Sequence, residues 1–207
     1  DHIDNFKVTV ALHTILHSRN IYPAELFIRA RKYNSHVQQC RHPTLCQWIR
    51  DAVQCCTEEL EKGTVSRISI VILSTADIPF ERFIFDVSGF PDLPQNQFDI
   101  PIENAKMSPF DLEEQYRAAI VRLGVCEATL GTLPEDCTFT ITIELRQKAN
   151  YPHSSTSWLP ESQRNVGTSY SQDVTTIPLR SVTFGDAIPF ELWIEESVAK
   201  SKLKASK

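Results

Sequence analysis

Three stretches of the chain repeat hydrophobic residues every three or four positions, which predicts three amphipathic helices. The first covers residues 5–19. The second begins after His42, which can cap its N-terminus, has a proline in the first helical position and ends at Gly63. The third opens with a capping-box pattern at residues 108–111 and fades near Gly131.

Other stretches alternate apolar and polar residues with a period of two, which is typical of strands with one buried face. Two of them, 67–73 and 81–87, are joined by the longer loop "STADIPF" and predict an antiparallel hairpin. Because helices and strands do not follow a strict βαβ order, the pattern indicates an α+β fold with an antiparallel sheet. The predicted strands are 25–34, 67–73, 81–87, 138–146, 176–182 and 189–196.

Residues 147–176 break the pattern, because they are rich in Ser, Thr and Asn and follow neither period. Loops of this length inside compact domains are usually functional or disordered. This one contains Trp158 and is followed by two more strands. We therefore interpret it as a strap that lies across a bound segment.

Composition and charge narrow the class of protein. The 207 residues are 42% hydrophobic and 23% charged, as in an ordinary soluble domain, and no apolar run approaches the ~20 residues of a membrane helix. We expect no signal peptide and no membrane partner. A net charge of −5 argues against direct, strong nucleic-acid binding, and basic residues cluster only at 29–32 and 200–207. Six cysteines, four of them on predicted helices, suit reduced thiols in the cytosol or nucleus.

Catalytic motifs are absent from the sequence, which has no Walker A loop, GxGxxG, GxSxG or HExxH. The best metal candidate is the group His36, Cys40, His42 and Cys46, but it lacks a CxxC and His42 already caps a helix. The cysteines are adequately explained as small buried hydrophobic residues. We therefore expect no enzyme, no cofactor and no metal, with a zinc-dependent enzyme as the alternative.

None of the three tryptophans lies at a position that the pattern predicts as part of the core. Trp48 flanks the apolar stripe of the second helix, Trp158 lies in the polar strap, and Trp193 lies on the polar face of a strand. Tryptophan is enriched among binding hot spots, which favours a binding module with at least two contact surfaces. For Trp193 the alternative is that a neighbouring loop or the Lys-rich tail covers it through a cation–π contact.

Several short motifs occur together in a recognisable order. The run "ILHSRNIYP" at 15–23, followed by Phe27, resembles the HORMA-domain family, which includes a spindle-checkpoint member. The pattern at 31–55 is narrower and resembles the branch that serves as accessory subunit of translesion DNA polymerase zeta. The similarity runs from about residue 13 to residue 196 and is weak only over 147–175.

The resemblance implies a single HORMA domain over 1–207, with a core (1–146), a C-terminal seatbelt (147–199) and a flexible basic tail (200–207). It implies a nuclear, and secondarily cytoplasmic, adaptor without catalytic activity. The seatbelt would lock a proline-containing segment of the polymerase catalytic subunit, and a second surface would bind the translesion deoxycytidyl transferase. The alternative is a spindle-checkpoint-type HORMA protein that captures checkpoint-partner peptides.

The resemblance also assigns residues to three surfaces. Those matching the partner-peptide site are Tyr22, Trp48 and Trp158. Those matching the transferase surface are Thr176, Glu191 and Trp193, where the pattern of the vertebrate members has leucine, glutamine and tyrosine, so the surface keeps its position but differs in its chemistry. Those matching the surface for a homodimer or HORMA heterodimer are Arg29, Arg117 and Ala128.

Overall fold

The computed structural model describes residues 3–32, 34–89, 109–146, 174–184 and 188–200. Its helices are α1 (Ile3–Ser18), the 3-10 turn η1 (Ala24–Leu26), α2 (Pro43–Glu61), α3 (Pro109–Gly124) and α4 (Glu127–Leu130). Its strands are β1 (Phe27–Lys32), β2 (Ser35–Cys40), β3 (Val65–Leu73), β4 (Pro79–Asp86), β5 (Thr138–Leu145), β6 (Val174–Phe184) and β7 (Ile188–Ser197).

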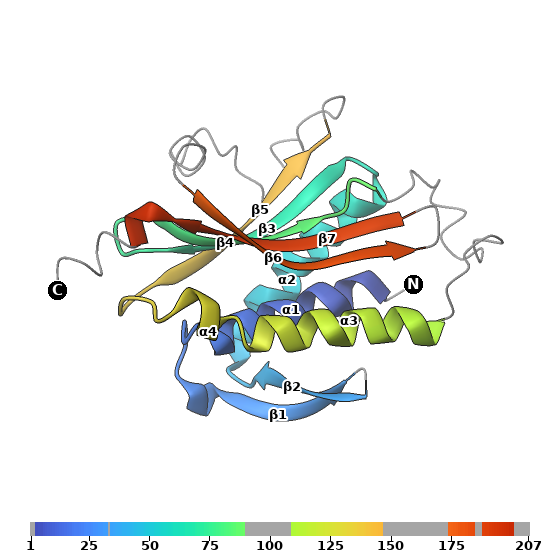
Figure 1. Cartoon of the computed structure of the whole chain (residues 1–207). Coiled ribbons are helices and arrows are strands. Elements are labelled where there is room, and N and C mark those ends of the chain that lie inside the picture. The colour runs from blue at the N-terminus through green and yellow to red at the C-terminus, as the bar shows by residue number, and fades with distance from the viewer. Residues whose placement is uncertain (1–2, 33, 90–108, 147–173, 185–187, 201–207) are drawn as a thin grey trace.

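The main sheet has five antiparallel strands in the order β5-β3-β4-β7-β6. The C-terminal hairpin β6–β7 therefore joins the sheet at β4, whereas β5 forms the opposite edge (Figure 1). Strands β1 and β2 pair separately and lie on the far side of the helices from the main sheet (Figure 1). The α+β class predicted from the sequence is confirmed.

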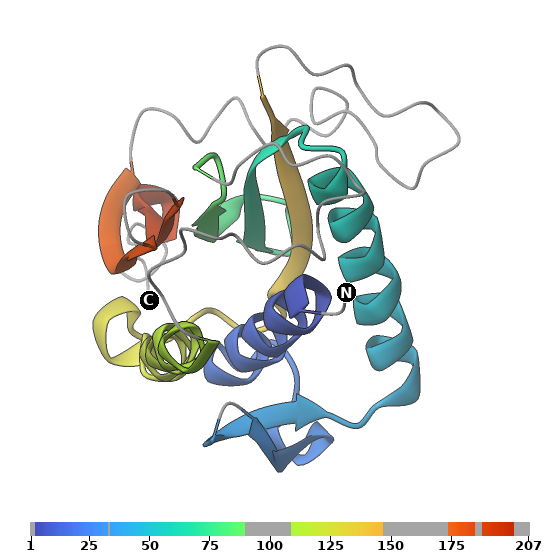
Figure 2. The same cartoon turned by 90° about the vertical axis from the view of Figure 1, so that its right-hand side faces the viewer.

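Helix α1 occupies the centre, between the sheet and the β1–β2 hairpin, and packs against α2, α3 and β2 (Figure 2). From Val10 to Ser18 every side chain is buried except the half-buried His17, as expected for a helix segment with no solvent face. Even its polar Thr14 is buried, and the hydroxyl of Thr14 donates to the carbonyl of Val10 at 2.8 Å. The helix thus serves as the core on which the other elements are assembled.

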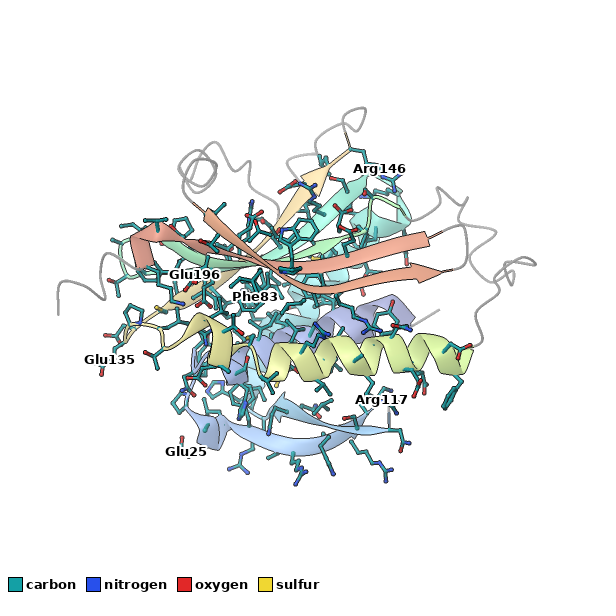
Figure 3. All side chains as sticks on the ribbon, viewed as in Figure 1. Glu25, Phe83, Arg117, Glu135, Arg146 and Glu196 are labelled. Carbon is teal, nitrogen blue, oxygen red and sulfur yellow. The ribbon has the colours of Figure 1, made fainter. Side chains whose placement is uncertain are left out.

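The inward face of the sheet supplies the rest of the core. Ile68, Ile70 and Ile72 of β3 alternate toward the helices, and Phe83 of β4 lies between the sheet and α3 (Figure 3). Leu192 and Ile194 of β7 continue the same face, since they pair with Phe85 and Phe83 of β4. The hairpin β6–β7 is therefore part of the packed core.

The cap predicted for the second helix is confirmed, because Nδ1 of His42 accepts from the amide of Leu45 at 3.4 Å. Gly63 has φ 67° just beyond the helix, the left-handed conformation that glycine adopts without strain. The strand expected at 25–34 is present as β1, but its partner β2 was not predicted. Asn34, at φ 50°, allows the chain to turn back into β2. The third helix ends at Gly124 and not near Gly131, and α4 follows as a separate turn.

Some sequence predictions fall outside the described residues. They are the capping residue Ser108, the strap 147–173 with Trp158, and residues 201–207 of the tail. Among the described helices, none is long and apolar enough to cross a membrane.

The assignment of Lys200 to a flexible tail is wrong. Its side chain is fully buried, and the ammonium donates to Glu81, to Glu196 and to the carbonyl of Leu130. The sequence pattern missed this because a lysine in a lysine-rich end is usually solvated. The ordered C-terminal segment extends at least one residue further than expected.

Candidate functional site

The edge strand β5 is the first feature that suggests binding. Among the described strands, only β3 pairs with it, so its other edge presents backbone N–H and C=O groups that no described strand uses. Such an edge is a template for an added strand. The β6–β7 hairpin does not occupy this edge, because it pairs at β4.

An aromatic cluster formed by Tyr22, Trp48 and Phe139 lies beside this edge. The Phe139 ring, on β5, meets the Trp48 ring edge-on, with centroids 5.1 Å apart and planes at 83°. Tyr22 approaches Phe139 from another side at 6.2 Å and 82°. Trp48 is 45% exposed, so the cluster presents an aromatic surface to solvent at the edge.

Two predicted peptide-binding residues, Tyr22 and Trp48, are thus brought together from the segment after α1 and from α2. Trp158 lies outside the described residues. Phe139, which links the two, was expected only as an inward core residue of its strand. Its position near the end of an alternating strand was the available signal, but a single strand does not reveal its neighbours.

The N-terminus of α2 fixes the position of Trp48. Besides the His42 cap, the Cys46 thiol donates to the carbonyl of Cys40 at 2.9 Å. Nδ1 of His13, from α1, accepts from the amide of Cys40 at 3.3 Å. Burial lowers the pKa of His13 to about 4, so near neutral pH its imidazole is uncharged and remains an acceptor. Helix α1, the end of β2 and the start of α2 are therefore joined by neutral hydrogen bonds.

The aromatic cluster is uncharged as well. Burial, together with the nearby Cys40 thiol, raises the pKa of Tyr22, so its phenol stays protonated. An uncharged, partly exposed aromatic surface beside an open strand edge suits an extended ligand with apolar side chains, prolines included.

A second feature is an open cavity on the C-terminal hairpin, here called the hairpin hollow, with a volume of about 670 Å³. It is lined by Arg122, Thr176, Pro178, Leu179, Arg180, Glu191, Leu192 and Trp193. All three residues predicted for the second-partner surface lie here. The pairing of β6 with β7 explains this, since Pro178 stands opposite Trp193 and Thr176 opposite Glu195.

Trp193 is less exposed than its sequence position suggested. It is half-buried, with the Arg67 guanidinium 5.4 Å from its ring centroid and its indole N–H donating to Glu195 at 3.3 Å. Arg67 is held in turn by Asp86 at 2.9 Å, and this hydrogen bond raises the pKa of Arg67. The cation–π contact foreseen from the tail comes instead from β3, and the tryptophan still borders the hollow.

Helix α3 connects the hollow to the core. Arg122 donates to the carbonyl of Leu179 at 2.8 Å, and Arg180 donates to Gln115. These two contacts run in opposite directions between α3 and β6. The wall of the hollow therefore depends on where α3 lies.

The residues predicted for self-association lie on three elements, with Arg29 on β1, Arg117 on α3 and Ala128 on α4. Arg117 pairs with Glu114 on the side of α3 that faces away from the sheet (Figure 3). Val121 and Val125, which the sequence analysis did not single out, are 52% and 62% exposed between Arg117 and Ala128. Val121 on α3 and Val125, the first residue after α3, are exposed apolar side chains four positions apart, and we call them the α3 strip.

The structure gives the metal candidate residues other roles. His42 caps α2 and Cys46 bonds the backbone of Cys40. Within the described ranges, no group of three or more His, Cys, Asp or Glu side chains is arranged to hold a metal ion.

Comparison with known proteins identifies the fold family. A family model described as the HORMA domain matches residues 6–167, most of the chain. The chain belongs to the HORMA-domain family. Two HORMA-fold structures share its architecture: a chain in "Crystal Structure of Mitotic Checkpoint Complex" has TM-score 0.73 at 20% identity, covering 94% of this chain and 96% of that one. The other, C. elegans HTP-2 bound to the HIM-3 closure motif, has TM-score 0.64 at 14% identity over 93% of this chain and 87% of that one.

Sequence relatives within the HORMA family are closer than these structures. The Schizosaccharomyces pombe protein named "DNA polymerase zeta processivity subunit" is 32% identical, covering 90% of this chain and 88% of the relative. The Homo sapiens protein named "Mitotic spindle assembly checkpoint protein MAD2B" is 32% identical, covering 92% and 88%. This HORMA chain therefore spans most of the length of both relatives.

Proposed function

We propose that this HORMA protein is a non-catalytic adaptor subunit of DNA polymerase zeta that works in translesion synthesis in the nucleus. It captures an extended, proline-containing segment of the catalytic subunit along the open edge of β5. The observation that carries the proposal is this edge with its uncharged aromatic cluster. The similarity to a polymerase zeta processivity subunit over 90% of the chain supports it.

The backbone and the side chains of the site would have different roles in recognising the segment. Hydrogen bonds from the β5 edge supply a grip that is independent of sequence, and the cluster selects the segment by contact with proline rings. Closing the seatbelt (147–199) over the segment costs ordering entropy, which the buried contacts offset. Binding should therefore be accompanied by a large negative heat-capacity change.

The hairpin hollow is the second surface of the adaptor in this proposal, and its partner is the translesion deoxycytidyl transferase. Trp193 supplies an anchored aromatic face there, while Thr176 and Glu191 are exposed beside it. The hollow and the β5 edge lie at opposite ends of the strand order, so both partners can bind at once. One domain thereby bridges two enzymes.

The test is calorimetry with proline-containing peptides from the catalytic subunit. Trp48→Ala should weaken binding by roughly 2–4 kcal/mol, the size of a hot-spot loss. Phe110→Ala is the matched control, because Phe110 is another exposed aromatic, at 66%, on a different helix. Equal affinities of wild type and a folded Trp48→Ala variant would refute capture at this cluster.

A second candidate function is peptide capture in the spindle checkpoint, which the name of the MAD2B relatives favours. Both functions would use the same edge and cluster. Competition between a polymerase-derived and a checkpoint-derived peptide for the same labelled complex separates them. The adaptor proposal requires the polymerase peptide to displace the label at far lower concentration.

A further inference from the structure

A buried group of four charges lies where the C-terminal segment meets the core. Arg19, at the end of α1, binds the carboxylate of Glu81 on β4 with two parallel hydrogen bonds, at 2.8 and 2.7 Å. Both side chains are essentially inaccessible, at 1% and 0% exposed. Arg19 also donates to the carbonyl of Gly131 at 2.8 Å. Neither residue of this pair comes from the C-terminal segment.

The other two charges come from the C-terminal segment. Glu196, on β7, stands directly opposite Glu81 in the β4–β7 register. Lys200 lies four residues further on, donates to Glu196 at 2.6 Å and also donates to Glu81. A third bond from its ammonium, at 2.8 Å, satisfies the carbonyl of Leu130. Lys200 is thus the cation that joins the two carboxylates.

We propose that Glu196 and Lys200 form a C-terminal latch, which holds β7 on β4 by inserting a neutral ion pair beside the neutral Arg19–Glu81 pair. Like charges directly opposite on neighbouring strands repel, so β7 pairs with β4 in this register only when Lys200 accompanies Glu196. The latch forms in only one register of β7 against β4, because the four charges meet only when Glu196 lies opposite Glu81.

The division of charges also makes the latch reversible. A buried charge that loses its partner is strongly destabilising. When β7 leaves β4, however, Arg19 keeps Glu81, and Glu196 keeps Lys200 at a spacing of four residues, so each half remains neutral. The segment can therefore dock and undock without leaving an unpaired charge in the core.

The latch sets how long a captured segment stays bound, and this part rests on the proposed function. Strands β6 and β7 end the seatbelt, and β7 is the element that anchors it to the core sheet. Release of a segment held under the seatbelt requires that anchor to open. A weaker latch should increase the dissociation rate more than it changes the association rate.

The test uses Lys200→Met, Glu196→Gln and the double variant, with Lys62→Met as the control. Lys62 has a comparable i,i+3 ion pair with Glu59, but its side chain is 52% exposed. Amide hydrogen exchange across the β4–β7 pair is measured in the chain alone, and peptide dissociation is measured separately. Lys200→Met should accelerate exchange in β7 by at least about tenfold relative to β3, as expected when coupled charges are separated.

The decisive comparison is between the single and double variants. Lys200→Met leaves two carboxylates with one cation, and Glu196→Gln leaves the opposite imbalance, whereas the double variant restores neutrality. Its β7 exchange should therefore be slower than the product of the two single effects predicts. Strictly multiplicative effects, or equal acceleration in β3 and β7, would overturn the latch.

The dissociation measurement separates the latch from the proposed function. Faster β7 exchange with an unchanged peptide dissociation rate would overturn the link to release. If the wild-type chain binds no polymerase peptide, the proposed function fails, and the exchange data still decide for or against the latch.

Discussion

Acidification should destabilise this protein through His13. The imidazole is buried, at 6% exposed, and its Nδ1 accepts from the amide of Cys40. Burial lowers its pKa from 6.5 to about 4 in the folded chain. Between these values the unfolded chain binds more protons than the folded one, so the free energy of unfolding rises with pH across this window and falls on acidification.

The magnitude follows from the difference of about 2.5 pH units between the two pKa values. At about 1.4 kcal/mol per unit, protonation of the unfolded chain removes up to about 3 kcal/mol between pH 6.5 and pH 4. Above pH 6.5 the contribution is fully present. A domain with a typical stability of about 5–15 kcal/mol would lose a substantial share of it.

Urea unfolding followed by circular dichroism, at pH values from 7.5 to 4.5, measures this dependence. The control is His13→Asn, because the Asn oxygen occupies a position close to Nδ1 and can still accept from Cys40, but does not titrate. Subtracting the two curves removes the carboxylates and the other histidines. The wild type should lose stability relative to the variant only below about pH 6.5.

Parallel curves for the two proteins would refute this reasoning. They would mean that His13 takes up its proton at the same pH in both states and that its burial carries no electrostatic cost. A proton NMR titration of the His13 ring in the folded protein gives the independent check.

Three further changes test the surfaces. Phe139→Ala and Trp48→Ala should be non-additive in peptide affinity by about 0.5–1.5 kcal/mol, because their rings touch edge-on, and additive losses in calorimetry would contradict that contact. Trp193→Ala should leave peptide affinity unchanged and weaken transferase binding at least about tenfold in surface plasmon resonance; a variant that only melts earlier would show a purely structural tryptophan. Val121→Asp should abolish any concentration-dependent dimer in sedimentation while leaving the melting temperature within a few degrees, and an unchanged dimer would exclude the α3 strip.

Periodicity was sufficient for most of the fold. The cap at His42, the stop at Gly63 and the alternation through Ile141 are local signals, and the structure has the elements they predict. The hairpin β1–β2 was missed because its turn depends on Asn34 in the left-handed conformation. An asparagine tolerates that conformation, but its presence in the sequence does not predict it. Strand order was not accessible either, because alternation places a residue on a face but does not say which strand lies next to it.

The candidate site shows the same division. Tyr22 and Trp48 could be named from the resemblance, but Phe139 between them depends on a contact across 117 positions from Tyr22. Lys200 shows this more clearly, because its partners come from β4, β7 and the end of α4. No local pattern distinguishes such a lysine from its solvated neighbours.

The paired contacts between α3 and β6 have a consequence for how this domain handles more than one partner. Arg122 is a wall of the hairpin hollow, while Val121, the preceding residue, is exposed on the same helix. A protein that binds along α3 and shifts it by even a fraction of a turn would move the carbonyl of Leu179 with it and reshape the hairpin hollow, where we propose that the transferase binds. Under that proposal, self-association along α3 and binding at the hollow would be coupled through one helix, so that a change in the affinity of one would change the affinity of the other.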